Sequence, residues 1–150
     1  LSLRELLELI EAYPQARAFI ETKHPVRFGS LVEQKLLEML HEFGVATPPS
    51  ADHSRAVVIS FSSAGVWRIR RHAPMLPTIL LGDTARVLGG GAATAVGATG
   101  IGPSVMTLRQ YPDLVDRAAA AGALAVDDVA HARREARFNE ELAKVTGSAE

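Results

Sequence analysis

Short runs of apolar residues alternate along this chain with stretches in which apolar residues recur every three or four positions. The first pattern is typical of buried strands and the second of amphipathic helices, so their alternation predicts parallel strands joined by helical crossovers. The clearest strand is 56–61, Ala-Val-Val-Ile-Ser-Phe, whose nearly unbroken apolar run suits a strand covered on both faces. We therefore expect an α/β fold with a parallel sheet.

Caps and breakers set the expected boundaries of the helices. Ser2 with Glu5 and Ser30 with Glu33 each match a capping box, in which two side chains satisfy the first free N–H groups of a helix. Ser62 is a further expected N-cap. The expected helices run from 2 to before 14, from 30 to 44, from 62 onward, from 112 to 121 and from 127 to 144, between expected strands at 17–22, 56–61, 78–81 and 98–103.

The composition limits the classes of protein to which this chain can belong. With 47% hydrophobic and 22% charged residues, 150 residues can bury one ordinary core, which excludes a disordered chain. The net charge of -1 gives no basic field, so we expect no nucleic-acid partner. No apolar run approaches the roughly eighteen residues of a transmembrane helix. The lack of Cys excludes disulfides and thiolate metal sites.

A carboxylate and an ammonium group come together at the end of the first expected strand. Glu21 and Lys23 are two residues apart, so in an extended chain they point to one face. Ile20 and Thr22 then point to the other face. A strand that simply ends in solvated polar residues explains this pair at least as well as a site does, if spacing is the only argument. A site for metal and phosphate is the sharper hypothesis.

The sequence around this pair reads Phe-Ile-Glu-Thr-Lys-His-Pro-Val-Arg-Phe-Gly-Ser-Leu-Val-Glu at 19–33. Two further segments follow in the same order, 56–62 continuing through 66–69, and Leu-Pro-Thr-Ile-Leu-Leu-Gly at 76–82. In order and spacing, these segments strongly resemble the glycerophosphodiester phosphodiesterases, in particular the actinobacterial branch of that family. The resemblance extends from about residue 2 to about residue 122.

The resemblance implies a partial (β/α)8 TIM barrel, in which parallel strands and helices alternate and the active site lies at the carboxyl ends of the strands. A whole barrel needs roughly 250 residues, so we expect this chain to hold part of one. The expected barrel part is 1–122, followed by a divergent, charged helical segment at 123–150. The His-Arg, Glu-x-Asp and His-Asp motifs that precede Glu-x-Lys in the family are not found in this sequence.

The resemblance also implies the chemistry. Glu21 would bind a divalent metal, Ca2+ or Mg2+, Lys23 would contact the substrate phosphate, and Phe61 would shape the substrate pocket. The general acid and base of the family are histidines that lie outside this chain. We expect the whole enzyme to hydrolyse glycerophosphodiesters to glycerol 3-phosphate and an alcohol, in glycerophospholipid metabolism. This segment alone is expected to be inactive or nearly so.

Other polar candidates carry less weight. His24 follows Lys23, but a loop histidine before proline is more often structural, and we assign it no catalytic role. The glycine run at 89–91 lacks the rest of a phosphate-binding motif and is expected to be a connection. The basic run at 68–72 is expected on the solvated outer face of the barrel. For Phe61, plain core packing explains the residue as well as a pocket role does.

Two other classes of function stay open. One is a noncatalytic barrel remnant that associates with a second copy or another chain through its strand edges, because an opened barrel leaves those edges unpaired. The other is a barrel phospholipase D that shares the Glu-x-Lys motif and differs in headgroup. We expect a cytoplasmic location, with an export signal upstream left open. The sequence decides neither the substrate alcohol nor the metal.

Overall fold

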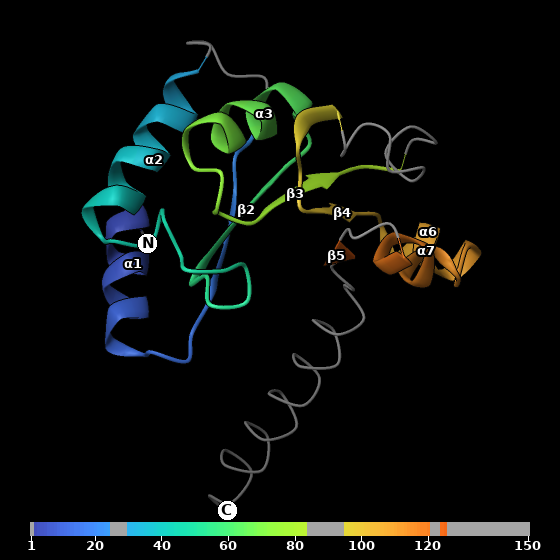
Figure 1. The fold of residues 1–150 in the computed structure, drawn as a ribbon, viewed down its shortest axis with the longest axis horizontal. Coiled ribbons are helices and arrows are strands. Elements are labelled where there is room, and N and C mark those ends of the chain that lie inside the picture. Colours follow the sequence, from blue (N-terminus) through green and yellow to red (C-terminus); the bar gives the residue numbers. More distant parts are fainter. Residues whose placement is uncertain (1, 25–29, 84–94, 121–123, 126–150) are drawn as a thin grey trace, which may run out of the picture.

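The computed structural model describes residues 2–24, 30–83, 95–120 and 124–125 (Figure 1). This part of the chain forms one sheet of five parallel strands, in which spatial neighbours follow one another in the order of the sequence. Because all strands run in the same direction, their carboxyl ends meet at one edge of the sheet. The strands are β1 (Ala18–Glu21), β2 (Ala56–Ser60), β3 (Thr78–Leu81), β4 (Gly100–Gly102) and β5 (Leu124–Ala125).

The helices of the described residues are α1 (Leu3–Ala12), α2 (Leu31–Glu42), α3 (Ser63–His72), α6 (Val105–Gln110) and α7 (Leu114–Ala120). In Figure 1 they follow one another around the sheet, with α1 and α2 on the left, α3 above, and α6 and α7 on the right. A sheet that grows in one direction with right-handed crossovers carries its helices on one face, whereas a doubly wound sheet reverses direction. The observed order is that of a partial (β/α)8 barrel, as the sequence predicts.

The core lies between the sheet and the helices and consists of two clusters of buried side chains. One cluster joins α1, α2 and α3 to the first two strands and includes Leu40, Val58 and Ile69, all fully buried. The other joins α3, α6 and α7 to the next two strands and includes Leu80 and Ile101. Burying one such side chain contributes about 1.5–3 kcal/mol, so these two clusters hold the helices against the sheet.

The two expected capping boxes turn out differently. At α1 the box is present, because Ser2 Oγ accepts a hydrogen bond from Glu5 N and the Glu5 carboxylate accepts one from Ser2 N. At α2 the prediction is wrong, since Ser30 has φ -85° and ψ 5° instead of extended angles and its side chain caps nothing. The Ser30 hydroxyl accepts a hydrogen bond from Gln34 Nε2 at 3.2 Å, and Glu33 is buried.

Most other boundaries agree with the sequence pattern. Gly44, expected to end α2, has a φ of +67°, which glycine adopts without strain. Ser62 caps α3 as expected, and its Oγ accepts a hydrogen bond from Gly65 N at 3.0 Å. The sequence pattern does not predict α6, although Ser104 caps it by accepting a hydrogen bond from Thr107 N. Nor does it predict β5, which lies just past residue 122.

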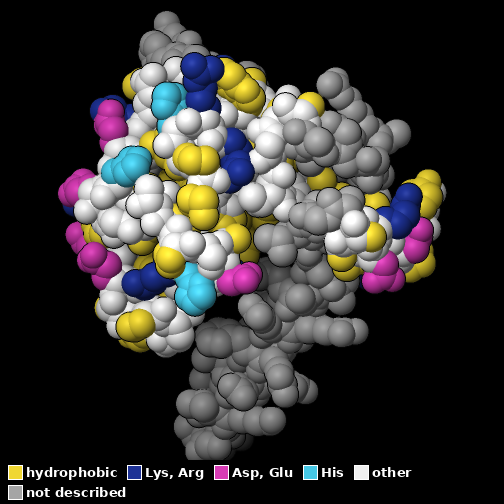
Figure 2. Space-filling model, viewed as in Figure 1, with side chains coloured by type: hydrophobic (Ala, Val, Ile, Leu, Met, Phe, Trp, Pro, Cys, Tyr) yellow, Lys and Arg dark blue, Asp and Glu magenta, His cyan; other side chains and the backbone are white. Residues whose placement is uncertain are grey.

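Other expectations concern two further segments, membrane-spanning helices and the surface charge. The glycine run at 89–91 and the helix expected at 127–144 lie outside the described residues. None of the helices that the structure describes is both long enough and apolar enough to cross a membrane. On the face drawn in Figure 2, the acidic and basic side chains of the described residues are interspersed.

Candidate active site

A pocket of about 430 Å³ opens at the carboxyl ends of strands β1 to β4. Its wall includes Glu21 at the end of β1, Phe61 after β2, Asp83 after β3 and Ser104 after β4. Parallel pairing brings these residues, which are far apart in the sequence, to one edge of the sheet. The catalytic residues of (β/α)8 barrels come from this edge, so the pocket is the candidate active site.

The alternation of side chains along each strand decides which of them reach the pocket. In β1, Phe19 and Glu21 line the pocket, while Ala18 and Ile20 pack into the core beside the helices. Glu21 therefore faces away from Ile20, as the spacing predicts. The next two strands repeat the pattern, with alternate residues on the pocket side: Ile59, Phe61, Ile79 and Leu81.

The structure places the three predicted site residues in different surroundings. Glu21 is exposed and lines the pocket. Phe61 also lines the pocket, and with 69% of it exposed it is not a core residue. Lys23 is exposed but is not among the residues that line the pocket. Because β1 ends at Glu21, regular strand alternation does not extend as far as Lys23.

Asp83, which the sequence pattern does not identify as a site residue, lines the pocket beyond the end of β3. Its Oδ1 accepts a hydrogen bond from Ser104 N at 2.7 Å, which ties the end of β3 to the start of α6. This bond, followed by one with the Thr107 side chain, lowers the pKa of the Asp83 carboxyl, so the group is an anion at neutral pH. An acidic residue two places after a strand that the sequence does predict is the signal that could have identified it.

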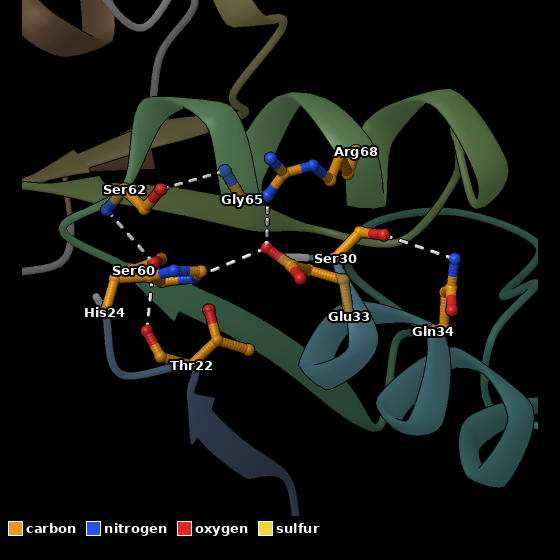
Figure 3. A network of polar contacts seen from close by, with 9 residues as sticks. All are labelled: Thr22, His24, Ser30, Glu33, Gln34, Ser60, Ser62, Gly65 and Arg68. Carbon is orange, nitrogen blue, oxygen red and sulfur yellow. Dashed lines mark hydrogen bonds and ion pairs between the residues drawn. The ribbon is translucent and has the colours of Figure 1, made fainter. Parts of the chain in front are cut away.

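A polar network centred on the buried Glu33 joins the segment after β1 to α2 and α3 (Figure 3). Glu33 is 1% exposed, and its Oε1 accepts a hydrogen bond from Arg68 Nη1 at 3.0 Å. The same oxygen lies 3.3 Å from His24 Nε2, a contact close enough for an ion pair but not aligned as a hydrogen bond. Figure 3 shows the His24 and Arg68 side chains converging on the Glu33 carboxylate.

The basic run at 68–72 is only partly solvated, so its prediction is wrong for two of its members. Arg68 is drawn into the buried network, because α3 packs against α2 as well as against the sheet. Arg70 is partly buried and donates to main-chain carbonyl groups just after the helix. Arg71 is exposed as expected, and its guanidinium lies 5.3 Å from the centre of the Trp67 ring.

The divalent metal that the resemblance implies can be tested against the described residues. Among them, no three His, Asp or Glu side chains lie close enough together to hold a metal ion. Glu21 offers one carboxylate on the pocket wall, and carboxylate oxygens are the ligands that Ca2+ and Mg2+ prefer. The described part of the chain therefore supplies one fitting ligand and does not form a complete metal site by itself.

Comparison with known proteins places this geometry in a family. Residues 2–128 match the glycerophosphoryl diester phosphodiesterase family. Over 123 residues the chain is 62% identical to proteins named probable glycerophosphodiester phosphodiesterase 1 in two strains of Mycobacterium tuberculosis. The match covers 81% of this chain and 45% of each relative, so the chain spans about half the length of these curated relatives.

A solved structure agrees with the fold. The crystal structure of a glycerophosphodiester phosphodiesterase from Parabacteroides distasonis superposes with a TM-score of 0.66 at 18% identity, over 82% of this chain and 48% of that one. At this level of identity the likeness shows the fold alone. Members of the matched family are generally metal-dependent. Because the family match extends over most of its length, the chain belongs to the glycerophosphoryl diester phosphodiesterase family.

Proposed function

We propose that this chain supplies the Glu-x-Lys side of the active site of a glycerophosphodiester phosphodiesterase. The observation that carries the proposal is the position of Glu21, on the pocket wall at the carboxyl end of β1. The reaction adds water across one phosphate ester bond. The oxygen of water ends on phosphorus, the bond to the alcohol oxygen breaks, and the alcohol leaves with a proton while glycerol 3-phosphate remains.

Lys23 is the proposed phosphate contact in this reaction. An ammonium group beside a phosphodiester neutralises its negative charge and stabilises the charge that builds on the nonbridging oxygens. Lys23 lies two residues after Glu21 and is exposed, so its flexible side chain can reach toward a ligand bound in the pocket. This assignment places the phosphate at the β1 end of the pocket.

The rest of the pocket suits the organic parts of the substrate. The exposed rings of Phe19 and Phe61 offer apolar surface against which carbon atoms of the substrate can pack. Asp83 is an anion and repels phosphate, so we place the leaving alcohol, with its hydroxyl or cationic groups, on the β3 side. The substrate would then lie across the strand ends, with its phosphate near Lys23 and its alcohol near Asp83.

We propose Ca2+ or Mg2+ as the metal, with Glu21 as one of its oxygen ligands and the other ligands outside the described residues. When bound, such an ion polarises the phosphodiester as a Lewis acid. The general acid and base are proposed to be histidines outside this chain, which would protonate the leaving alcohol and activate the attacking group. On this basis the isolated segment is expected to be inactive or nearly so.

A second candidate role is association of the segment with another copy of itself. Among the described strands, β1 pairs only with β2, which leaves one edge of the sheet open, and Phe19 on this strand is 47% exposed. An apparent mass that rises with concentration on a sizing column would support this role, whereas a monomer at every concentration would exclude it.

For the whole enzyme we propose a cytoplasmic location, which cell fractionation can test.

The activity is best tested in a chimera that completes the barrel. The 123-residue region of the Mycobacterium tuberculosis relative that matches this chain is replaced by this chain's own residues. We expect the purified chimera to release glycerol 3-phosphate from glycerophosphocholine when Ca2+ or Mg2+ is present. Glu21→Gln and Lys23→Met should each lower kcat/KM by at least about a hundredfold, because each removes charge stabilisation from the reacting phosphate.

Matched controls come from an exposed ion pair on α2. Lys35 Nζ lies 2.6 Å from a Glu38 carboxylate oxygen, and both side chains are largely exposed. Glu38→Gln and Lys35→Met repeat the two chemical changes away from the pocket and should leave kcat/KM unchanged. A folded chimera without activity, or one whose activity does not depend on Glu21 and Lys23, would contradict the proposal.

A further inference from the structure

Contacts with other parts of the fold hold both sequence neighbours of Lys23 in place, Thr22 before it and His24 after it. Thr22, just before it, is 3% exposed. The Thr22 N–H donates to the Ile59 carbonyl at 3.0 Å, and the Thr22 carbonyl accepts a hydrogen bond from Ser60 Oγ at 3.0 Å. These bonds fasten the chain to β2 immediately before Lys23, although β1 itself has already ended.

His24 fastens the chain on the other side of Lys23. Its side chain is 15% exposed, and its Nε2 lies 3.3 Å from Glu33 Oε1. Glu33 is held in turn by Arg68 of α3, whose Nη1 donates to the same oxygen at 3.0 Å. Figure 3 shows this chain of contacts, which leads from α3 through the α2 carboxylate to the residue that follows Lys23.

Stability alone does not explain a carboxylate in this place. Glu33 is 1% exposed, and its Oε2 has no hydrogen-bond partner among the described residues. A buried ion pair often stabilises a protein no more than apolar residues of similar volume would. Where helix α3 passes Glu33 and His24, its residue is Gly65. A Cβ atom at this position would lie 2.9 Å from both Glu33 Oε1 and His24 Nε2. The packing is arranged around the contact between His24 and Glu33.

We propose that Glu33 is a positioning residue that acts through His24 to fix the main chain at Lys23 and so to aim the Lys23 ammonium at the substrate phosphate. This role rests on the proposed function, in which Lys23 contacts phosphate. A lysine on a loosely held segment spends only part of its time in a suitable direction, and its apparent affinity falls by that fraction. Neither Glu33 nor Arg68 is among the residues that line the pocket, so each would act on the phosphate only through other residues.

The test compares His24→Gln with His24→Leu in the 150-residue chain. Gln can place an N–H donor near the position of His24 Nε2, whereas Leu fills the space without a donor. The NMR order parameter of the Lys23 amide reports how firmly the main chain is held. We expect about 0.85 in the unaltered chain and in His24→Gln, and below about 0.6 in His24→Leu. Both variants keep Glu33, because replacing that buried residue can unfold the protein.

The same samples are then titrated with sn-glycerol 3-phosphate, and the shift of the Lys23 amide resonance gives the affinity. His24→Leu should weaken binding about three- to tenfold, and His24→Gln should restore it, because only the competent fraction of Lys23 binds. Ile10→Ala opens a cavity in the core beside α1 and controls for lost stability, so it should leave binding unchanged.

The possible outcomes distinguish the positioning role of Glu33 from the proposed function of Lys23. If the unaltered chain binds and His24→Leu changes neither order nor affinity, the positioning role is refuted and the proposed function stands. Looser order at Lys23 with unchanged affinity also refutes the positioning role, as does an equal loss of affinity in Ile10→Ala. If the unaltered chain does not bind sn-glycerol 3-phosphate near Lys23, the same variants are compared in the chimera, whose barrel is complete. A chimera that does not bind the ligand there either would refute the proposed function, and the positioning role with it.

Discussion

Replacing Arg68 by Met tests how strongly the buried Glu33 carboxylate depends on its cationic partner. Arg68 Nη1 donates to Glu33 Oε1 at 3.0 Å, so the change leaves a carboxylate that is 1% exposed with only the 3.3 Å contact to His24 within this network. Breaking a buried pair by removing one partner costs about 3–5 kcal/mol. Because the Arg68 side chain is 33% exposed and partly screened, we expect a smaller loss in the free energy of unfolding, about 2–3 kcal/mol.

Urea unfolding followed by circular dichroism measures this loss as a lower midpoint at an unchanged slope. Arg71→Met is the matched control, since it makes the same change on the same helix where the guanidinium is exposed over the Trp67 ring, a contact worth about 0.5–1 kcal/mol. Adding Glu33→Leu to Arg68→Met should recover part of the loss, because the buried charge is then gone. Equal losses for Arg68→Met and Arg71→Met would refute the reasoning.

Three further changes test other parts of the structure. Gly65→Ala places a methyl group 2.9 Å from Glu33 Oε1 and should lower the free energy of unfolding by about 1–3 kcal/mol in urea titrations, whereas no loss would mean that the cluster is loosely packed. Ser62→Ala removes the cap of α3 and should cost about 1 kcal/mol, while Ser30→Ala, at a position without a cap bond, should cost clearly less; equal losses in denaturant would contradict this difference. A backbone hydrogen bond lowers the pKa of Asp83, so its ionised carboxyl stabilises the fold above about pH 4 and loses this effect as the pH falls through the folded-state pKa. Asp83→Asn should therefore flatten the acid side of the thermal-stability profile, and an unchanged profile would count against the bond.

The features that the sequence predicts well are those decided by local pattern. The apolar run at 56–61 becomes β2, because a strand buried on both faces needs no partner-specific information to be recognised. The spacing of Glu21 from Ile20 likewise places them on opposite faces, since alternation is a property of any strand. Local motifs also indicate the family, and the match over residues 2–128 agrees with them.

The features that the sequence pattern misses depend on contacts between distant segments. Ser30 and Glu33 match a capping box, but α3 brings Arg68 against Glu33 and draws that carboxylate into the core. Local spacing carries no information about a partner 35 residues away. Asp83 is overlooked for the same reason, because its role depends on Ser104, 21 residues further along the chain.

The most direct test of Glu21 and Lys23 as site residues is a crystal structure of the chimera with Ca2+ or Mg2+ and sn-glycerol 3-phosphate bound. We predict a Glu21 carboxylate oxygen at about 2.0–2.6 Å from the ion. The Lys23 ammonium should lie at about 2.7–2.9 Å from a phosphate oxygen, with the Phe61 ring beside the glycerol group. If the ion and the phosphate bind elsewhere while Glu21 and Lys23 point into solvent, then neither residue belongs to the site.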